Sequence, residues 1–487
     1  VVLKRNKFIS MSYSDLKDKW LEHYKSAPSQ LEKMGEVKGL ISAFNANVDA
    51  VIKVSGKDIE TIISENNLDL LKIISAGENS IQTNEDAIRG FLQCFKDGKA
   101  EEWLIEDKSV FSWLNKTVGY DKLQMGGQGG IVANVMAVCG VDSVYVHCAS
   151  NPKEQAQLFL DLDNLLSVDE NGKVAQASKV NRKDDLPLIH WIIEFDKGDT
   201  INLNGTTYTC PKANRFIATY DPLNFKLHID EQFSKCMAKD DVNSEYIILS
   251  GYQMLHENLK DGGKGIDRID ASKKMIKTWT KSCPNNILHL EVASTQDKVI
   301  RKHLINSLVE SVDSLGFNER ELIDILEVIG EEDLAVKCEA DINAENMFLG
   351  MLKIYEYTGC PRLQLHMFGL YLTLQKKGFK VTPMQNRDGM QLAATVAAAK
   401  AGTGAINSKD VLLWAHGHKV SDVGLNELAN LQKLITSKYG ENQLLETGMF
   451  NDDSIEIIAV PTILIDKPVT LVGMGDTISS VSLVGAR

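Results

Sequence analysis

The stretch VTLVGMGDTISS, residues 469–480, carries the local signals that decide the fold class. Residues 469–472 form a short apolar run of the kind that makes a buried strand, and Gly473 and Gly475 permit a tight turn after it. A helix is expected to begin near Thr477. A strand that leads through a glycine turn into a helix is the repeating unit of a parallel α/β sheet.

The same alternation recurs along the chain. Strand-like apolar runs occur in GLISAFNA (39–46), SVYVHCAS (143–150), EYIILSGY (245–252), NILHLEVA (286–293) and DVLLWAHG (410–417). Amphipathic stretches such as KVIRKHLINSLVESV (298–312) and ELIDILEVI (321–329) lie between them. The pattern predicts an α/β fold with a doubly wound, mostly parallel sheet, whose ligand sites lie beyond the carboxyl ends of the strands.

Two segments depart from this rhythm. Residues 51–120 are rich in charge and helix formers and show no run typical of a buried strand, whereas residues 188–226 alternate in a β-like manner. We expect the two segments to form one smaller α+β lid, inserted twice and joined by β-crossings. The large domain would then comprise residues 1–50, 121–187 and 227–487.

Composition limits the partners of the chain. Its 487 residues are 44% hydrophobic and 24% charged, which suits one large or two moderate globular domains. The longest apolar stretch, Ile455 to Ile465, contains Glu456 and Pro461 and is too short to cross a bilayer. A net charge of −13 repels nucleic acid and anionic membranes. We therefore expect small-molecule ligands, with no nucleic acid and no membrane as partner.

The amino-terminal residues and the cysteines predict a cytoplasmic protein. The segment VVLKRNKFIS is basic but lacks the apolar core and cleavage site of a secretory signal, and Met11 resembles a natural start. The eight cysteines form no C-x-x-C pair, so neither a zinc knuckle nor a redox motif is present. Scattered reduced thiols are typical of intracellular enzymes.

Asp476 has two interpretations. An Asp directly before a helix can cap it by accepting hydrogen bonds from the free N–H groups of the first turn. On a glycine-flanked turn that binds an anion, the same carboxylate could instead take a proton from an attacking hydroxyl while those N–H groups stabilise a transferring phosphoryl. The stretch is not a dinucleotide fingerprint, because the last glycine of G-x-G-x-x-G is missing, and no G-x-x-x-x-G-K-[ST] loop occurs.

Two stretches could form the wall of a sugar site. Asn45 and Asp49 follow the first strand, with Asn47 between them, and such side chains suit recognition of vicinal hydroxyls; an Asx turn is the alternative. In MGGQGGIVANVMA, Gly127 and Gln128 lie where a bare backbone and one amide could accept a sugar, and a tight strand-to-helix turn is the alternative.

Further polar clusters could bind a cation and an anion. Glu291 lies two residues after His289 on one strand face and could hold Mg²⁺; a satisfied polar pair is the alternative. Glu321 ends an N-x-x-E sequence and could also hold Mg²⁺, although the sequence by itself favours a helix capping box there. Basic residues in and just before the second lid segment could face an anion or be solvated surface charge. Lys212 and Arg215 lie in the segment, and Lys179, Arg182 and Lys183 lie upstream of it.

Together these residues resemble the ADP-dependent sugar kinases, the archaeal phosphofructokinases and glucokinases of the ribokinase-like superfamily. The resemblance covers nearly the whole chain. It is carried, in this order, by NANVDA (45–50), GGQGGIVAN (126–134), HWIIEF (190–195), ANRFIA (213–218), LSGYQ (249–253), HLEVAS (289–294), GFNEREL (316–322) and VGMGDTIS (472–479). The resemblance implies a large α/β domain with a smaller lid that closes on the sugar.

The resemblance also implies roles for single residues. Asp476 would be the base, with Gly473 and Gly475 in the anion-binding turn and Arg215 near the phosphates. The implied sugar contacts are Asn45, Asp49, Gly127 and Gln128, with Lys179, Arg182 and Lys183 for a 6-phosphate and Glu78 for the 2-hydroxyl of glucose. Glu291 and Glu321 would organise Mg²⁺. The family's R-x-H-x-H stretch corresponds here to RLQLH (362–366), which leaves His366 as the implied nucleotide contact.

The reaction implied is transfer of a phosphoryl group from Mg·ADP to fructose 6-phosphate, which yields AMP and fructose 1,6-bisphosphate. Phosphorylation of glucose, alone or beside this activity, is the alternative within the family. A dinucleotide-dependent oxidoreductase is an alternative from a different class, and the absent glycine fingerprint disfavours it. A sugar-binding protein without enzymatic activity would have no use for an outward base at Asp476.

Overall fold

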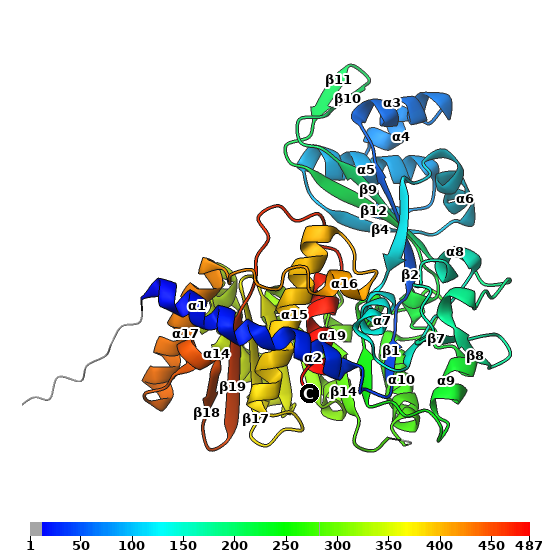
Figure 1. The fold of residues 1–487 in the computed structure, drawn as a ribbon. Coiled ribbons are helices and arrows are strands. Elements are labelled where there is room, and N and C mark those ends of the chain that lie inside the picture. Colours follow the sequence, from blue (N-terminus) through cyan, green and yellow to red (C-terminus); the bar gives the residue numbers. More distant parts are fainter. Residues whose placement is uncertain (1–11, 282) are drawn as a thin grey trace, which may run out of the picture.

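The computed structural model describes residues 12–281 and 283–487 (Figure 1). The segment VVLKRNKFIS and the expected start at Met11 lie outside these residues. The chain builds an eleven-stranded sheet, a six-stranded sheet and a two-stranded hairpin. We call the elements around the eleven-stranded sheet the large lobe and those around the six-stranded sheet the small lobe.

The large sheet has the order β18-β19-β17-β16-β15-β14-β13-β1-β6-β7-β8. Seven neighbouring strands run parallel and the two ends are antiparallel, which confirms the predicted doubly wound, mostly parallel sheet. The strands are β1 (Leu40–Ala43), β6 (Val144–Val146), β7 (Leu165–Val168), β8 (Val174–Gln176), β13 (Tyr246–Leu249), β14 (Ile287–Glu291), β15 (Ser314–Phe317), β16 (Arg362–Met367), β17 (Leu370–Lys376), β18 (Met449–Asn451) and β19 (Ile455–Pro461).

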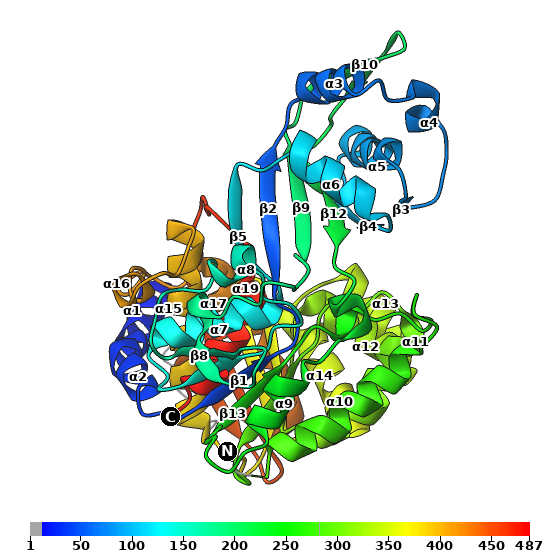
Figure 2. The same ribbon diagram turned by 90° about the vertical axis from the view of Figure 1, so that its right-hand side faces the viewer.

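Helices cover both faces of this sheet, with α2, α7, α15 and α19 on one face and α10, α12 and α14 on the other (Figure 2). Because both faces are covered, central strands such as β13 and β14 are buried along their whole length. The helices are α1 (Tyr13–His23), α2 (Ala27–Met34), α7 (Gln128–Cys139), α8 (Lys153–Ala156), α9 (Glu231–Met237), α10 (Gly265–Trp279), α11 (Lys298–His303), α12 (Glu319–Ile329), α13 (Glu332–Ala340), α14 (Ala344–Thr358), α15 (Pro383–Thr403), α16 (Lys409–Leu412), α17 (Asp422–Tyr439), α18 (Leu444–Thr447) and α19 (Met474–Val484).

The small lobe has its own sheet, in the order β3-β4-β12-β9-β2-β5, and its own hydrophobic core. Aromatic side chains fill that core: Phe91, Phe95, Trp103, Trp191, Phe195 and Phe216. Its elements are β2 (Asn47–Lys53), β3 (Ser80–Ile81), β4 (Glu101–Ile105), β5 (Lys122–Gly126), β9 (Ile189–Phe195), β12 (Asn214–Tyr220), the hairpin β10 (Thr200–Leu203) with β11 (Thr206–Thr209), and helices α3 (Gly56–Glu65), α4 (Leu70–Ile74), α5 (Asn84–Asp97) and α6 (Lys108–Thr117).

The segments expected to form the lid meet in this sheet, but its limits differ from the expectation. Residues 51–120 do contain a strand, β4, in which Trp103 is buried while Glu101 and Glu102 remain accessible; the charges hid the strand from the sequence pattern. Strand β2 crosses the expected boundary at residue 50, and β5 lies in the small sheet. The division into two domains and the closing motion stay predictions.

Two expected strands of the large lobe are wrong. Residues 469–472 form an exposed loop in which Val469 and Leu471 are each 68% exposed, and α19 begins at Met474, before Thr477. The run DVLLWAHG (410–417) forms α16 and turns, because a short apolar run does not by itself distinguish a strand from a helix. Nowhere in residues 12–281 and 283–487 is a helix both long enough and apolar enough to cross a membrane.

Candidate active site

A cavity of about 770 Å³ lies where the chain passes from β1 in the large sheet to β2 in the small sheet. Its walls come from both lobes, and its position beyond the carboxyl ends of β1 and β13 is the one expected for a doubly wound sheet. The cavity brings together seven of the residues singled out from the sequence: Asn45, Asp49, Gly127, Gln128, Arg215, Gly473 and Asp476.

Asp476 lies in the first turn of α19 and faces this cavity. The residue that begins the helix is Gly473, with φ 61°, so Asp476 is not the N-cap residue. Burial raises the pKa of Asp476, while a hydrogen bond from the Gln128 side chain and the charge of Lys400 act in the opposite direction. The positive end of the helix and a partly exposed carboxylate thus share one wall.

Lys400, on α15, supports this turn from behind. Its Nζ donates to the Gly473 carbonyl at 3.0 Å and to Thr477 Oγ1 at 3.1 Å. Lys400 was not singled out from the sequence. It could have been, because AATVAAAKAGT (393–403) places one charge in a run of small apolar residues, a pattern that predicts a buried lysine.

A second part of the lining, which we call the acceptor wall, is rich in amides and carboxylates. The Asn47 side-chain amide donates to Asp49 Oδ1 at 2.9 Å, whereas the buried Oδ1 atoms of Asn45 and Asn47 have no partner among the described residues. A Cβ on Gly126 would lie 2.1 Å from Asp49 Oδ1, and one on Gly127 would lie 2.5 Å from the Asn45 carbonyl oxygen. Glycine is therefore required there, and the wall offers acceptors to a ligand rich in hydroxyl groups.

His190, on β9, lines the same wall and was not singled out from the sequence. Its Nε2 lies 3.1 Å from Asp221 Oδ2, and its Nδ1 lies 3.9 Å from Glu102 Oε1. Burial lowers the pKa of His190, but the hydrogen bond to Asp221 and the charge of Glu102 outweigh burial and raise the pKa to about 9. An imidazolium surrounded by carboxylates therefore borders the cavity.

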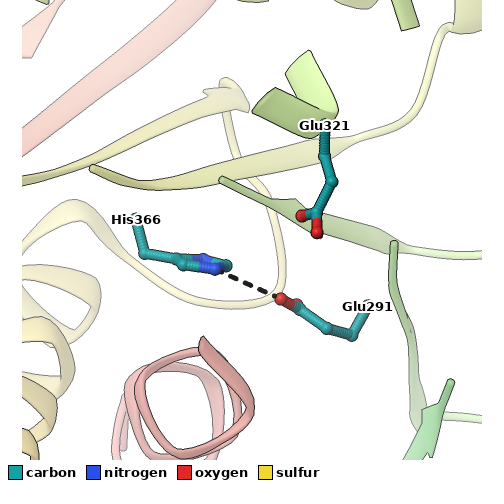
Figure 3. Close-up of side chains that lie close together, drawn as sticks. All are labelled: Glu291, Glu321 and His366. Carbon is teal, nitrogen blue, oxygen red and sulfur yellow. Dashed lines mark ion pairs between the residues drawn. The ribbon is translucent and has the colours of Figure 1, made fainter. Parts of the chain in front are cut away.

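A second cluster lies beside the turn of α19 and joins Glu291, Glu321 and His366 (Figure 3). One ligand atom of each lies within 4.8 Å of the others, and His366 Nε2 is 3.5 Å from Glu291 Oε1. His366 therefore lies with the two glutamates and does not line the main cavity. Gly475 packs closely against His366, since a Cβ at position 475 would lie 2.9 Å from His366 Nε2. Two carboxylates and an imidazole form a donor set that suits a divalent cation.

The two carboxylates of this cluster both have raised pKa values. Burial and the neighbouring Glu321 hold the pKa of Glu291 well above its ordinary value, and burial raises the pKa of Glu321 to about 8. Glu321 also closes a capping box with Asn318, so the two interpretations of this residue are compatible. Ser479 donates to Glu291 Oε2, and His289 lies 3.2 Å from the same oxygen; both orient the carboxylate.

The basic residues considered for a 6-phosphate do not line the cavity. Arg182 is 6% exposed, and its guanidinium pairs with Asp185 at 2.6 Å and with Asp230 at 2.9 Å, so it anchors its own loop. Lys179 and Lys183 are exposed outside the cavity. Arg215 is the residue of the basic set that reaches the lining.

Glu78 is exposed and lies outside the cavity, whereas Glu102 of β4 lines it. Thr219 Oγ1 donates to Glu102 Oε1 at 2.6 Å and fixes that side chain. Upstream of His366, Arg362 is fully buried and bonds to Ser314 and Gln364. Most of the RLQLH stretch is therefore core, whereas His366 lies with Glu291 and Glu321; its implied nucleotide contact stays a prediction.

Comparison with known proteins identifies the family. Residues 38–485 match the ADP-specific Phosphofructokinase/Glucokinase conserved region. The chain belongs to this family. It is 32% identical to the ADP-dependent glucose/glucosamine kinase of Pyrococcus furiosus, over 96% of this chain and 98% of that one. It is therefore an ADP-dependent sugar kinase of the ribokinase-like fold.

Two solved structures agree closely with this fold. The last common ancestor of ADP-dependent phosphofructokinases from Methanosarcinales superposes with a TM-score of 0.85 at 30% identity, covering 98% of this chain and 99% of that chain. An ADP-dependent kinase in complex with fructose-6-phosphate and ADPβS superposes with a TM-score of 0.79 at 29% identity, covering 98% of both chains.

Proposed function

We propose that the protein transfers the β-phosphoryl group of Mg·ADP to fructose 6-phosphate and releases AMP and fructose 1,6-bisphosphate. The observation that carries the proposal is the placement of Asp476 in the lining of one cavity together with the unpartnered acceptors of Asn45 and Asn47. The kinase relative solved with fructose-6-phosphate and ADPβS supports this pair of ligands.

In the proposed reaction, the acceptor wall holds the sugar through hydrogen bonds from its hydroxyls to Asn45, Asn47 and Asp49. Asp476 takes the proton of the attacking hydroxyl as the new oxygen–phosphorus bond forms and the bond between the two phosphates of ADP breaks. The N–H groups at the start of α19 stabilise the negative charge that develops during transfer.

Glu291, Glu321 and His366 are the residues proposed to hold the divalent cation. When bound, the cation would neutralise charge on the diphosphate. Closing of the small lobe over the cavity would exclude water, which would otherwise compete with the sugar as acceptor.

Glucose is the second candidate acceptor, and a specific observation favours it. Glu102 lines the cavity, and a carboxylate there can accept hydrogen bonds from sugar hydroxyls. Lys179, Arg182 and Lys183 do not line the cavity, so Arg215 and Lys122 are left to bind a 6-phosphate. One enzyme could therefore phosphorylate both sugars.

The test is AMP production with ADP or ATP as donor and with fructose 6-phosphate or glucose as acceptor. We expect AMP with ADP and fructose 6-phosphate, and the glucose reaction reports whether the enzyme is bifunctional. Absence of AMP with either sugar would contradict the proposal. Binding of a nicotinamide cofactor would instead support the oxidoreductase alternative.

The setting of the enzyme is part of the proposal. All eight cysteines are free thiols, which suits a reducing cytoplasm. The net charge of −13 disfavours nucleic acid and anionic membranes as partners. A role in glycolysis follows from the proposed product. The archaeal origin of the Pyrococcus furiosus relative supports an archaeal source for this enzyme.

A further inference from the structure

Lys400 brings a positive charge into the interior of the large lobe. The residue lies in the last turn of α15 and is 8% exposed. Its ammonium and the Thr477 hydroxyl both donate to the Gly473 carbonyl oxygen, at 3.0 Å and 2.8 Å, and the Thr477 N–H donates to the same oxygen at 3.2 Å. Three donors therefore fix one carbonyl at the point where α19 begins.

This lysine has no ion-pair partner within the described parts of the chain. Its hydrogen-bond partners are the Gly473 carbonyl and the Thr477 hydroxyl, both uncharged, and Asp476 is the charged group that acts on it. A buried ammonium without an ion pair is unfavourable for folding, and an apolar side chain of equal length would avoid that penalty. The charge therefore lacks a purely structural explanation.

The position of the charge indicates what it acts on. Gly473 is the N-cap residue of α19, and the cavity is lined by Gly473 and Asp476. The ammonium lies behind this turn, on the side opposite the open space, because it bonds to the backbone of the turn and is not itself among the cavity-lining residues. Its field adds to that of the helix N-terminus at the same point.

We infer that Lys400 is a positioning residue for phosphoryl transfer, which fixes the turn at Gly473 and adds positive charge behind the site where the transferring group binds. The inference rests on the proposed function. The negative partial charge of the Gly473 carbonyl is neutralised by its three donors, so the N–H groups of the first turn present an undiminished positive field to an anion.

The test compares three substitutions at this position. Lys400→Met keeps the length of the side chain without charge, Lys400→Gln keeps a donor without charge, and Lys400→Arg keeps the charge. Lys273→Met is the matched control, because Lys273 on α10 is also largely buried and also donates to a backbone carbonyl, that of Ser307, at 2.8 Å. Thermal unfolding of each variant separates folding from catalysis.

We expect Lys400→Met and Lys400→Gln to lower kcat by roughly 10- to 100-fold while the KM for sugar stays within about twofold. Lys400→Arg should restore most of kcat, and Lys273→Met should leave kcat unchanged. An unchanged kcat in Lys400→Met would overturn the inference. Equal kcat values for Lys400→Gln and Lys400→Arg would overturn it too, and this second comparison decides the matter if Lys400→Met does not fold.

Wild-type AMP production is measured first. If the wild type forms no AMP from ADP with either sugar, the proposed function fails. If the wild type is active and the uncharged variants match it, this inference alone fails.

Discussion

The two walls of the cavity differ in how far the chain satisfies its own polar groups. On the large-lobe wall, the Gly473 carbonyl has three donors. On the acceptor wall, the Oδ1 atoms of Asn45 and Asn47 are buried without partners among the described residues. The charges of the large-lobe wall are therefore fixed by the chain before a ligand binds. The acceptor wall, in contrast, is completed by a ligand that donates hydrogen bonds.

The largest effect is expected on the wall that carries the base. Asp476→Asn should lower kcat by roughly 1,000-fold and leave the KM for sugar nearly unchanged, because the amide cannot take the proton while the acceptor wall is intact. Steady-state measurement of AMP release checks this. Asp422→Asn is the control, since Asp422 also lies in the first turn of a helix but is exposed and far from the cavity. Normal turnover in Asp476→Asn would remove the base from the mechanism.

The next effect concerns the charged histidine of the acceptor wall. Because the folded pKa of His190 is raised from 6.5 to about 9, its stabilising contribution is complete below pH 6.5 and is lost as the pH rises through 9. The contribution corresponds to a free energy of unfolding on the order of 3 kcal/mol.

Denaturant unfolding of wild type and His190→Gln measures this contribution. The wild type should be the more stable of the two at about pH 6, and the difference should shrink by about pH 10. A difference that is the same at both values would show that His190 is neutral in the folded protein, and the carboxylates around it would then need another source of positive charge.

The next prediction concerns the cluster of Glu291, Glu321 and His366. Glu291→Gln should raise the Mg²⁺ concentration needed for half-maximal activity by roughly 10- to 100-fold, because the amide keeps the shape of the side chain and loses its charge. The measurement is AMP formation as a function of Mg²⁺. Glu339→Gln, an exposed glutamate paired with Arg320, is the control. Equal Mg²⁺ dependence in both variants would place the cation elsewhere.

The smallest effect separates the basic residues that line the cavity from those that do not. Arg215→Met should raise the KM for fructose 6-phosphate by about 10-fold, because it removes a charged donor at the cavity surface. Lys183→Met should leave this KM unchanged, since Lys183 lies outside the cavity. The reverse result would mean that the sugar phosphate binds against the loop of residues 179–183.

Much of the fold could be predicted because buried parallel strands consist mainly of apolar residues, as in β13 and β14. Strand β4 was missed because a half-buried strand carries its charges on the exposed face. The loop of residues 469–472 was mistaken for a buried strand because it is apolar, although its side chains are exposed to solvent. A local sequence pattern does not show which face of a segment is covered by the rest of the chain.

The candidate site was predictable where its polar residues lie close together in the sequence, as at Asn45 and Asp49, or beside glycines, as at Gln128. It was not predictable where distant segments meet. Lys400 and His190 acquire their surroundings from α19 and from Asp221, and Arg182 is paired with Asp230, which only the folded chain brings close, as well as with Asp185, three residues along the chain. Basic residues in a sequence therefore do not by themselves mark an anion site.

The most direct test follows the phosphoryl group itself, with ADP radiolabelled in its β-phosphoryl group and incubated with enzyme, Mg²⁺ and fructose 6-phosphate. The account predicts that with the wild type the label appears in the sugar product in equal amount to the AMP released, and that Asp476→Asn slows this transfer by roughly 1,000-fold while still binding the sugar. With the wild type, label that appears in inorganic phosphate, or that stays in ADP while the sugar is bound, would contradict the account.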